Sequence, residues 1–128
     1  IGEKGLESCV FWQKKAPQYQ MKGVYQQADL FLLPTEYEIF GMVLLEAMFF
    51  RRVVLTTPNG GADMLLRSGE NGLVLEKSDP ARRAKTLLDT AADPEKKARM
   101  EQAAYETVIH ENTWDALTDR FLAVYEKR

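Results

Sequence analysis

Two carboxylates, Glu38 and Glu46, are the side chains of this 128-residue chain whose type and spacing best suit chemistry. Glu46 lies within the apolar run Met42–Phe50. An ionised carboxylate that leaves water without partners is destabilised by several kcal/mol. We therefore expect Glu46 either to reach a cleft where a ligand completes its hydrogen bonds, or to form an ion pair with Arg51 or Arg52.

The segment that holds Glu46 is predicted to be a helix over 41–50, which follows an apolar strand and a short polar turn. The first turn of a helix presents unpaired N–H groups and the positive end of the dipole, which suits a phosphate. Gly41 has no Cβ, so a ligand can approach its backbone closely. A phosphate on this turn, with Glu46 accepting hydrogen bonds from ribose hydroxyls, would suit a nucleotide.

A structural alternative exists for Glu38. The sequence Thr35-Glu-Tyr-Glu38 fits the S/T-x-x-E capping box, in which the two side chains satisfy backbone N–H groups at a helix start. On this interpretation Thr35 is the N-cap, the helix begins near Glu36, and neither residue needs a function. Spacing alone favours the cap.

The elements that must position these residues alternate between strand and helix. Helical patterns at 19–28, 41–50 and 62–68 separate apolar runs, and the two central runs are almost continuously apolar, as in parallel strands covered on both faces. This order predicts an α/β fold, in which ligands bind outside the carboxyl ends of the strands. The predicted strands are Ser8–Trp12, Asp29–Leu33, Val53–Thr57 and Leu73–Glu76.

The remainder of the chain is predicted to be helical. Asp79 and Asp93 each precede a proline, an N-cap followed by a favoured first helical residue, so helices are expected over 79–91 and 93–111. We therefore expect one domain, with an α/β part at 1–76 and a helical part at 77–128.

A third helix is expected after a cap at Asn112 or Thr113. Its apolar residues follow the i, i+4, i+7, i+8 spacing of one helix face. They are Leu117, Phe121, Val124 and Tyr125.

Composition excludes several classes of protein. The net charge is −2 and no dense basic run occurs, which argues against a nucleic-acid partner. No apolar run approaches the ~18 residues of a membrane span. One cysteine and one histidine, His110, give no metal-ligand pattern, and His110 is expected at the surface or in packing. We expect no metal and no cofactor, and a cytoplasmic location or, in a longer protein, a peripheral one at the membrane.

The segment "ADLFLLPTEYEIFGMVLLEAM" contains a Glu, seven residues and a second Glu, in the arrangement E-x-F-G-x-x-x-x-E-A. With the following "VVLTTPNGGADMLLRSGENGLVLE" and the pair Thr113-Trp114, it resembles the retaining GT-B glycosyltransferases of family 4 and their glycogen-synthase-like relatives. The resemblance covers most of the chain from Tyr25 onward. It implies the later part of a C-terminal, donor-binding domain, with about four strands of a Rossmann-like parallel sheet followed by helices.

The resemblance also implies roles for particular residues. Glu46 resembles the Glu that binds the ribose of a sugar nucleotide, and Glu38 the catalytic Glu near the donor sugar. A residue can cap a helix and bind a ligand at once, so the cap on Glu38 does not exclude this role. The implied donor-binding residues are Thr35, Phe40, Gly41, Met42, Val43, Glu46, Gly60 and Gly61.

Two departures from the family pattern bear on the site. Arg51 stands where the family usually has Gly after the motif helix, so a left-handed helix end would be strained there. Met64 stands where the family usually has Glu after the Gly-Gly pair, with Asp63 one position early. Donor contacts from that loop are therefore in doubt.

The function implied is transfer of a sugar from a UDP-, GDP- or ADP-type donor to an acceptor hydroxyl, with retention of configuration. The acceptor, a sugar, glycan, lipid or other hydroxyl compound, would bind an N-terminal domain that is absent from this sequence. A sugar-nucleotide epimerase of the same fold and a non-catalytic interaction module are the alternatives. These 128 residues alone are expected to be inactive and, because a truncated sheet exposes a strand edge, to self-associate.

Overall fold

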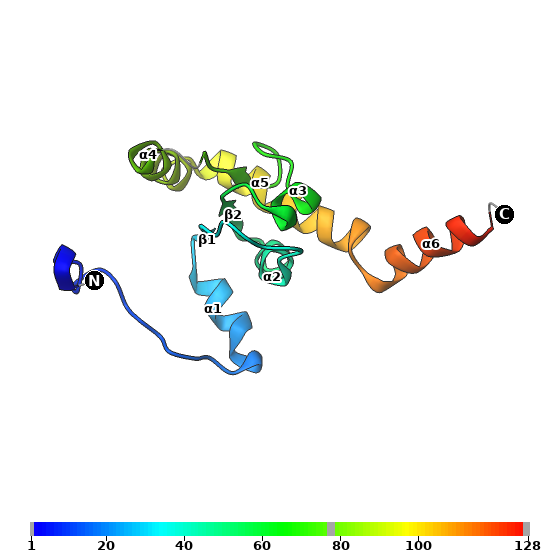
Figure 1. The fold of residues 1–128 in the computed structure, drawn as a ribbon, viewed down its shortest axis with the longest axis horizontal. Coiled ribbons are helices and arrows are strands. Elements are labelled where there is room, and N and C mark those ends of the chain that lie inside the picture. The colour runs from blue at the N-terminus through cyan, green and yellow to red at the C-terminus, as the bar shows by residue number, and fades with distance from the viewer. Residues whose placement is uncertain (1, 77–78, 127–128) are drawn as a thin grey trace.

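Three parallel strands form the centre of the protein in the computed structural model, which describes residues 2–76 and 79–126 (Figure 1). They are β1 (Leu30–Leu33), β2 (Val53–Thr56) and β3 (Leu73–Val74), in the order β1-β2-β3. The register pairs Leu32 with Leu55, and Leu55 with Leu73. The predicted α/β class with a small parallel sheet is confirmed.

The central strand β2 is covered on both faces. All four of its residues are 0% exposed. Val54 packs with Leu44 and Met48 on one face, while Val53 and Leu55 pack with Met100 on the other. This explains the continuous apolar run of β2, because neither of its faces reaches water.

Six α-helices occur within the described residues. Two short 3-10 turns, Gly2–Lys4 and Gln18–Gln20, precede them. Most bounds agree with the prediction, but the helix expected at 62–68 begins and ends earlier. The helices are α1 (Met21–Gln27), α2 (Met42–Phe49), α3 (Gly60–Leu65), α4 (Pro80–Ala91), α5 (Pro94–Glu111) and α6 (Trp114–Tyr125).

The predicted N-caps of the last three helices are confirmed. The carboxylate of Asp79 accepts a hydrogen bond from the N–H of Ala81 at 2.8 Å, and that of Asp93 from Lys96 at 2.9 Å. Between the two residues considered for the cap of α6, the structure selects Thr113. Local capping chemistry therefore set these three starts.

The predicted strand Ser8–Trp12 is wrong. The chain there forms a turn followed by irregular backbone, and Phe11 and Trp12 are 89% and 80% exposed. Figure 1 shows this N-terminal segment, in blue, running away from the sheet. A strand needs a neighbour to satisfy its backbone groups, and no described strand lies beside this segment. The sheet therefore has three strands here rather than about four.

Helix α5 joins the predicted helical part to the α/β part. Met100 belongs to the core on one side of the sheet, and Ala104 and Val108 belong to the core on the other side. Helix α5 therefore packs against the α/β part through both clusters, and the single-domain division stays a prediction. The boundary predicted at residue 77 lies outside the described residues.

Helix α6 extends away from the sheet, at the red end of the chain in Figure 1. None of its residues is buried. The apolar stripe predicted there is largely exposed, with Phe121 at 65% and Val124 at 67%. The helix prediction is confirmed, but the described part of the chain does not cover its apolar face.

Candidate functional site

The turn between β1 and α2, residues 34–41, is anchored by hydroxyls at the ends of β1 and β2. The hydroxyl of Thr56 donates to the carbonyl oxygen of Leu33 at 2.7 Å, and the hydroxyl of Thr57 donates to the carbonyl oxygen of Thr35. The amide of Asn59 donates to the hydroxyl of Thr56 at 3.0 Å. Because Thr56, Thr57 and Asn59 are buried, the turn starts from a fixed point at the carboxyl ends of two parallel strands.

The Gly60-Gly61 pair lets the start of α3 lie directly against this turn. A Cβ at Gly61 would be 2.5 Å from the carbonyl oxygen of Phe40, and one at Gly60 would be 3.0 Å from that of Ile39. The N–H of Gly61 donates to the carbonyl oxygen of Glu38 at 3.2 Å. The pair therefore supports the turn, and donor contacts by Gly60 and Gly61 stay predictions.

The capping box predicted at Thr35 is wrong, because α2 begins at Met42 after Gly41. Gly41 has a φ of +77°, which L side chains rarely adopt, so a helix from Glu36 cannot run through it. The hydroxyl of Thr35 instead donates to the carbonyl oxygen of Tyr37 at 3.1 Å. Thr35 therefore shapes the turn rather than capping the helix.

Glu38 does hold the backbone at the start of α2. Its Oε1 accepts a hydrogen bond from the N–H of Gly41 at 3.1 Å, and its side chain is half-buried. The second oxygen, Oε2, has no hydrogen-bond partner among the described residues. Glu38 thus combines a structural contact with an oxygen that remains available to a ligand.

The first turn of α2 has N–H groups that the protein does not use. The N–H groups of Leu44 and Leu45 donate to the carbonyl oxygen of Gly41, at 2.8 and 3.4 Å. Those of Met42 and Val43 have no partner in the described chain, and both side chains are exposed. Two amides at the positive end of a helix form a site suited to an anion.

Glu46 lies one turn further along α2 and is half-buried. Its Oε2 accepts a hydrogen bond from the hydroxyl of Tyr25 at 2.9 Å. This partner was missed by sequence reasoning, which expected either a ligand or an arginine, Arg51 or Arg52, to complete the bonding of Glu46. Tyr25 lies in α1, and nothing in the local spacing around Glu46 indicates it.

The ion pair considered for Glu46 is wrong. Arg51 lies over the ring of Tyr105, with its guanidinium carbon 4.0 Å from the ring centroid. Arg52 donates to the carbonyl oxygen of Ala28 at 2.7 Å. Both guanidinium groups therefore bind elsewhere, and Glu46 forms no ion pair with either arginine.

The second oxygen of Glu46, Oε1, has no partner among the residues that the structure describes. No fully buried side-chain oxygen or nitrogen in that part of the chain lacks a hydrogen bond, so Oε1 must reach solvent. A carboxylate oxygen with unused lone pairs, open to solvent on an otherwise apolar helix, can accept hydroxyl donors from a ligand.

The hydroxyl of Tyr25 is held in its donating form. Burial and the hydrogen bond to the Glu46 carboxylate raise the pKa of Tyr25 above its usual value of 10.0. Loss of the phenol proton would place two negative charges in contact. Tyr25 therefore remains a donor to Glu46 throughout the ordinary pH range.

Several cavities lie among the described residues, and two of them are near the elements discussed above. One of about 600 Å³ lies between the start of α2 and helix α6, where Phe40, Met42 and Met64 face Trp114 and Phe121.

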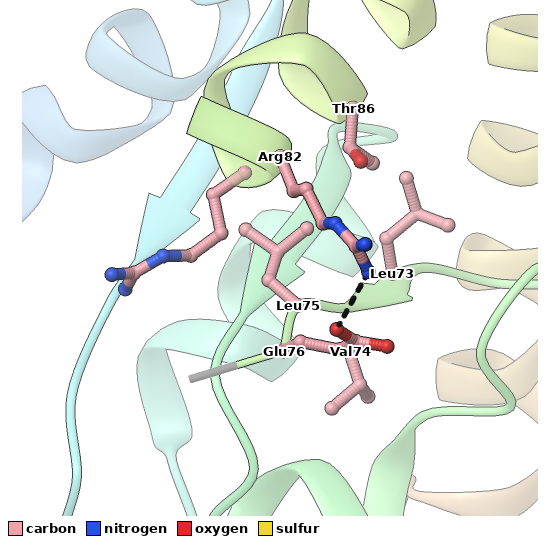
Figure 2. Close-up of a pocket in the computed structure, with 7 residues that line it drawn as sticks. Leu73, Val74, Leu75, Glu76, Arg82 and Thr86 are labelled. Carbon is pink, nitrogen blue, oxygen red and sulfur yellow. Dashed lines mark ion pairs between the residues drawn. The ribbon is translucent and has the colours of Figure 1, made fainter. Parts of the chain in front are cut away.

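Another cavity, of about 260 Å³, lies along β3, and Figure 2 shows the ion pair between Arg82 and Glu76 at this cavity. The distance from Nη1 of Arg82 to Oε2 of Glu76 is 3.7 Å. That ion pair is mostly exposed, so it adds only about 0–1 kcal/mol. No group of three or more His, Cys, Asp or Glu side chains that could hold a metal occurs in residues 2–76 and 79–126. None of the described helices is both long and apolar enough to cross a membrane.

Comparison with curated proteins gives relatives that act on sugars. A D-inositol 3-phosphate glycosyltransferase from Thermomonospora curvata is 32% identical over 125 residues, which is 96% of this chain and 28% of the relative. An alpha-maltose-1-phosphate synthase from Mycolicibacterium smegmatis is 28% identical over 125 residues, which is 92% of this chain and 32% of the relative. The chain thus spans about a third or less of the length of these relatives.

Solved structures share the fold. The C-terminal domain of a group 1 family glycosyl transferase, LpcC from Francisella tularensis, superposes with a TM-score of 0.77 at 23% identity over 88% of this chain and 58% of that one. Sucrose-phosphate synthase from Thermosynechococcus elongatus gives 0.86 at 24% identity, over 98% of this chain and 32% of that one. HepE from Anabaena, in complex with UDP-glucose, gives 0.78 at 23% identity, over all of this chain and 35% of that one.

The family assignment rests on the sequence profile described as Glycosyl transferases group 1, which matches residues 1–107. The matched range includes the turn, α2 and the glycine pair that build the candidate site. The fold is that of the C-terminal domains of GT-B glycosyltransferases, as the structural neighbours show. Because the profile covers well over half of its residues, this chain belongs to the group 1 family of glycosyl transferases.

Proposed function

We propose that this chain forms part of the donor site of a retaining glycosyltransferase of the family 4 type, a hexosyltransferase that moves a sugar from a nucleotide-sugar to an acceptor hydroxyl. One observation carries the proposal. Helix α2 combines two unused N–H groups in its first turn with a half-buried carboxylate whose Oε1 is open to solvent. These are the partners that a diphosphate and a ribose require.

The diphosphate would bind the backbone N–H groups of Met42 and Val43. Negative charge develops on the leaving diphosphate during transfer, so donors fixed by the helix stabilise the transition state without having to reorganise. Gly41 would let the phosphate approach the backbone closely, because glycine has no Cβ. Its φ of +77° is a second reason for glycine at this position, since a residue with a side chain would be strained there. Phe40 and Thr35 would complete the donor-binding turn.

Glu38 is proposed to act near the donor sugar. Its Oε1 is fixed by the N–H of Gly41, so Oε2 is left to position the sugar or to stabilise its developing positive charge. The carboxylate is held by the same turn that would hold the diphosphate. Donor sugar and leaving group would therefore be oriented by one rigid segment.

The donor is proposed to be of the UDP, GDP or ADP type. A structural neighbour binds UDP-glucose, which supports the UDP form. The acceptor, a sugar, glycan, lipid or other hydroxyl compound, is proposed to bind a part of the protein outside these residues, because the curated relatives are about three times longer. We propose a cytoplasmic location and no need for a metal or cofactor.

Binding of UDP-glucose to the intact protein, measured by calorimetry, tests this proposal. We expect Glu46→Ala to weaken binding by about tenfold or more, since the ribose hydroxyls lose a charged acceptor. Glu95→Gln, at an exposed carboxylate in the first turn of α5, is the matched control and should bind as wild type.

Several outcomes would contradict the proposal. Equal binding by wild type and Glu46→Ala would remove the ribose site. If wild type binds none of UDP-, GDP- and ADP-glucose, an interaction module becomes the better interpretation. Release of an epimerised nucleotide-sugar instead of a glycosylated acceptor would indicate an epimerase.

A further inference from the structure

The contact between Tyr25 and Glu46 joins two helices that are far apart in sequence. The hydroxyl of Tyr25, in α1, lies 2.9 Å from Oε2 of Glu46, in α2, and the residues are 21 positions apart. The hydroxyl occupies one of about four lone-pair positions on the carboxylate. It therefore fixes one oxygen of Glu46 and leaves Oε1 to the solvent side.

The ring of Tyr25 is held by packing on both sides. Its centroid is 5.4 Å from that of Phe50, with the rings stacked, and 5.9 Å from that of Phe31, with the rings tilted. The residue is 3% exposed and belongs to the core with Leu44 and Ala47. The position of the hydroxyl is therefore set by the core rather than by solvent.

A half-exposed carboxylate without such a donor would be free to rotate. The terminal torsion of Glu is broad and roughly two-fold, so packing of the carbon chain does not fix the two oxygens. A hydrogen bond from a rigid, buried phenol restricts that torsion. Ligand hydroxyls would then meet an acceptor that is already oriented, which lowers the ordering entropy of binding.

We propose that Tyr25 is a positioning residue that orients the Glu46 carboxylate so that Oε1 accepts the ribose hydroxyls of the donor. The inference rests on the proposed function, because it takes Glu46 as the ribose acceptor. It adds a residue of α1, outside the turn and α2, to the residues that determine donor affinity. Tyr25 acts through Glu46 and does not itself contact the ligand.

The test compares a nucleoside diphosphate with its analogue that lacks the ribose hydroxyls. Of UDP, GDP and ADP, the one that binds intact wild-type protein most tightly is used, together with its 2′,3′-dideoxy form. Tyr25→Phe keeps the ring and removes only the hydroxyl. We expect Tyr25→Phe to weaken the natural diphosphate about tenfold and to leave the dideoxy form within twofold of wild type.

Tyr105→Phe is the matched control. Tyr105 lies at the other end of the same aromatic cluster, packed against Phe49, and its hydroxyl has no hydrogen bond within the described residues. It should bind both diphosphates as wild type does. In a Glu46→Ala background, Tyr25→Phe should change affinity less than twofold, because the residue through which it acts is gone. Melting temperatures of all variants check that each protein is folded.

Each other outcome overturns the inference in a distinct way. If Tyr25→Phe weakens both diphosphates equally, Tyr25 supports the core rather than orienting Glu46. If it weakens neither, the hydrogen bond has no role in binding. If wild type does not distinguish the natural from the dideoxy form, the ribose role of Glu46 fails, and the proposed donor site fails with it.

Discussion

At the scale of single residues, Arg51 occupies a position whose backbone favours glycine. Its φ is +56°, its N–H donates to the carbonyl oxygen of Met48, and the N–H of Arg52 donates to that of Ala47. This is the Schellman arrangement, so the strain expected at Arg51 from the sequence is confirmed. The stacking of its guanidinium on Tyr105 and its hydrogen bond to Gln102 offset part of that strain.

Substitution of Arg51 separates the backbone strain from the side-chain contacts. Arg51→Gly relieves about 1–2 kcal/mol of strain from the left-handed backbone conformation. It also loses the cation–π contact with Tyr105, which contributes about 0.5–1 kcal/mol. Because these two effects oppose each other, the free energy of unfolding of the variant should stay within about 1 kcal/mol of wild type. Arg51→Val keeps the strain and loses the contact, so it should be less stable by about 1–2 kcal/mol. Urea denaturation measures both variants, and a large loss of stability in Arg51→Gly would contradict this account.

At the scale of elements, the start of α3 sets the position of the donor-binding turn. The carbonyl oxygens of residues 38–40 lie only 2.5 to 3.0 Å from the positions that Cβ atoms of Gly60 and Gly61 would take. The glycines are thus required by a close approach of two backbones, since both have ordinary helical conformations without a positive φ. The turn, α2 and α3 therefore form one packed unit at the carboxyl ends of β1 and β2.

Gly61→Ala should damage this unit because backbone atoms cannot yield to a new Cβ as a flexible side chain can. We expect a loss of about 1–3 kcal/mol in stability and at least a tenfold loss in UDP-glucose affinity as the turn shifts. Gly23→Ala is the control, because a Cβ there meets nothing within 4 Å. It should raise stability by about 0.5–1 kcal/mol through helix propensity and leave affinity unchanged. Unchanged binding in Gly61→Ala would show that α3 does not support the turn.

At the scale of the whole molecule, two stretches of exposed apolar surface bear on self-association. Leu32, on the edge strand β1, is 44% exposed, and the far edge of this strand has no partner among the described strands. Helix α6 exposes Trp114, Phe121 and Val124. Edge strands and apolar faces of this kind promote association.

The 128-residue chain is predicted to form dimers or larger species. Sedimentation at increasing concentration measures this, and a monomer at high concentration would contradict it. Phe121→Glu combined with Val124→Glu should lower the average mass if α6 mediates the association. Arg99→Glu, which also changes charge at an exposed position, should leave it unchanged.

Much of the fold is predictable because its signals are local. The Asp79, Asp93 and Thr113 caps, the buried run of β2 and the end of α2 at Arg51 each depend on residues within one or two turns. The strand at Ser8–Trp12 was predicted by the same kind of signal and is wrong. A strand depends on a neighbour, and an apolar run does not reveal whether that neighbour is present.

The sequence by itself determined the order of the elements from α1 onward, the caps of the last three helices and the family motif that contains Glu38 and Glu46. Only the tertiary structure decided that Glu46 contacts Tyr25, whereas the contact of Glu38 with Gly41 is local. The hydrogen bond from Tyr25 to Glu46 spans 21 positions and that from Arg51 to Gln102 spans 51. Contacts of this length follow from how helices pack on the sheet, which spacing along a single helix does not specify.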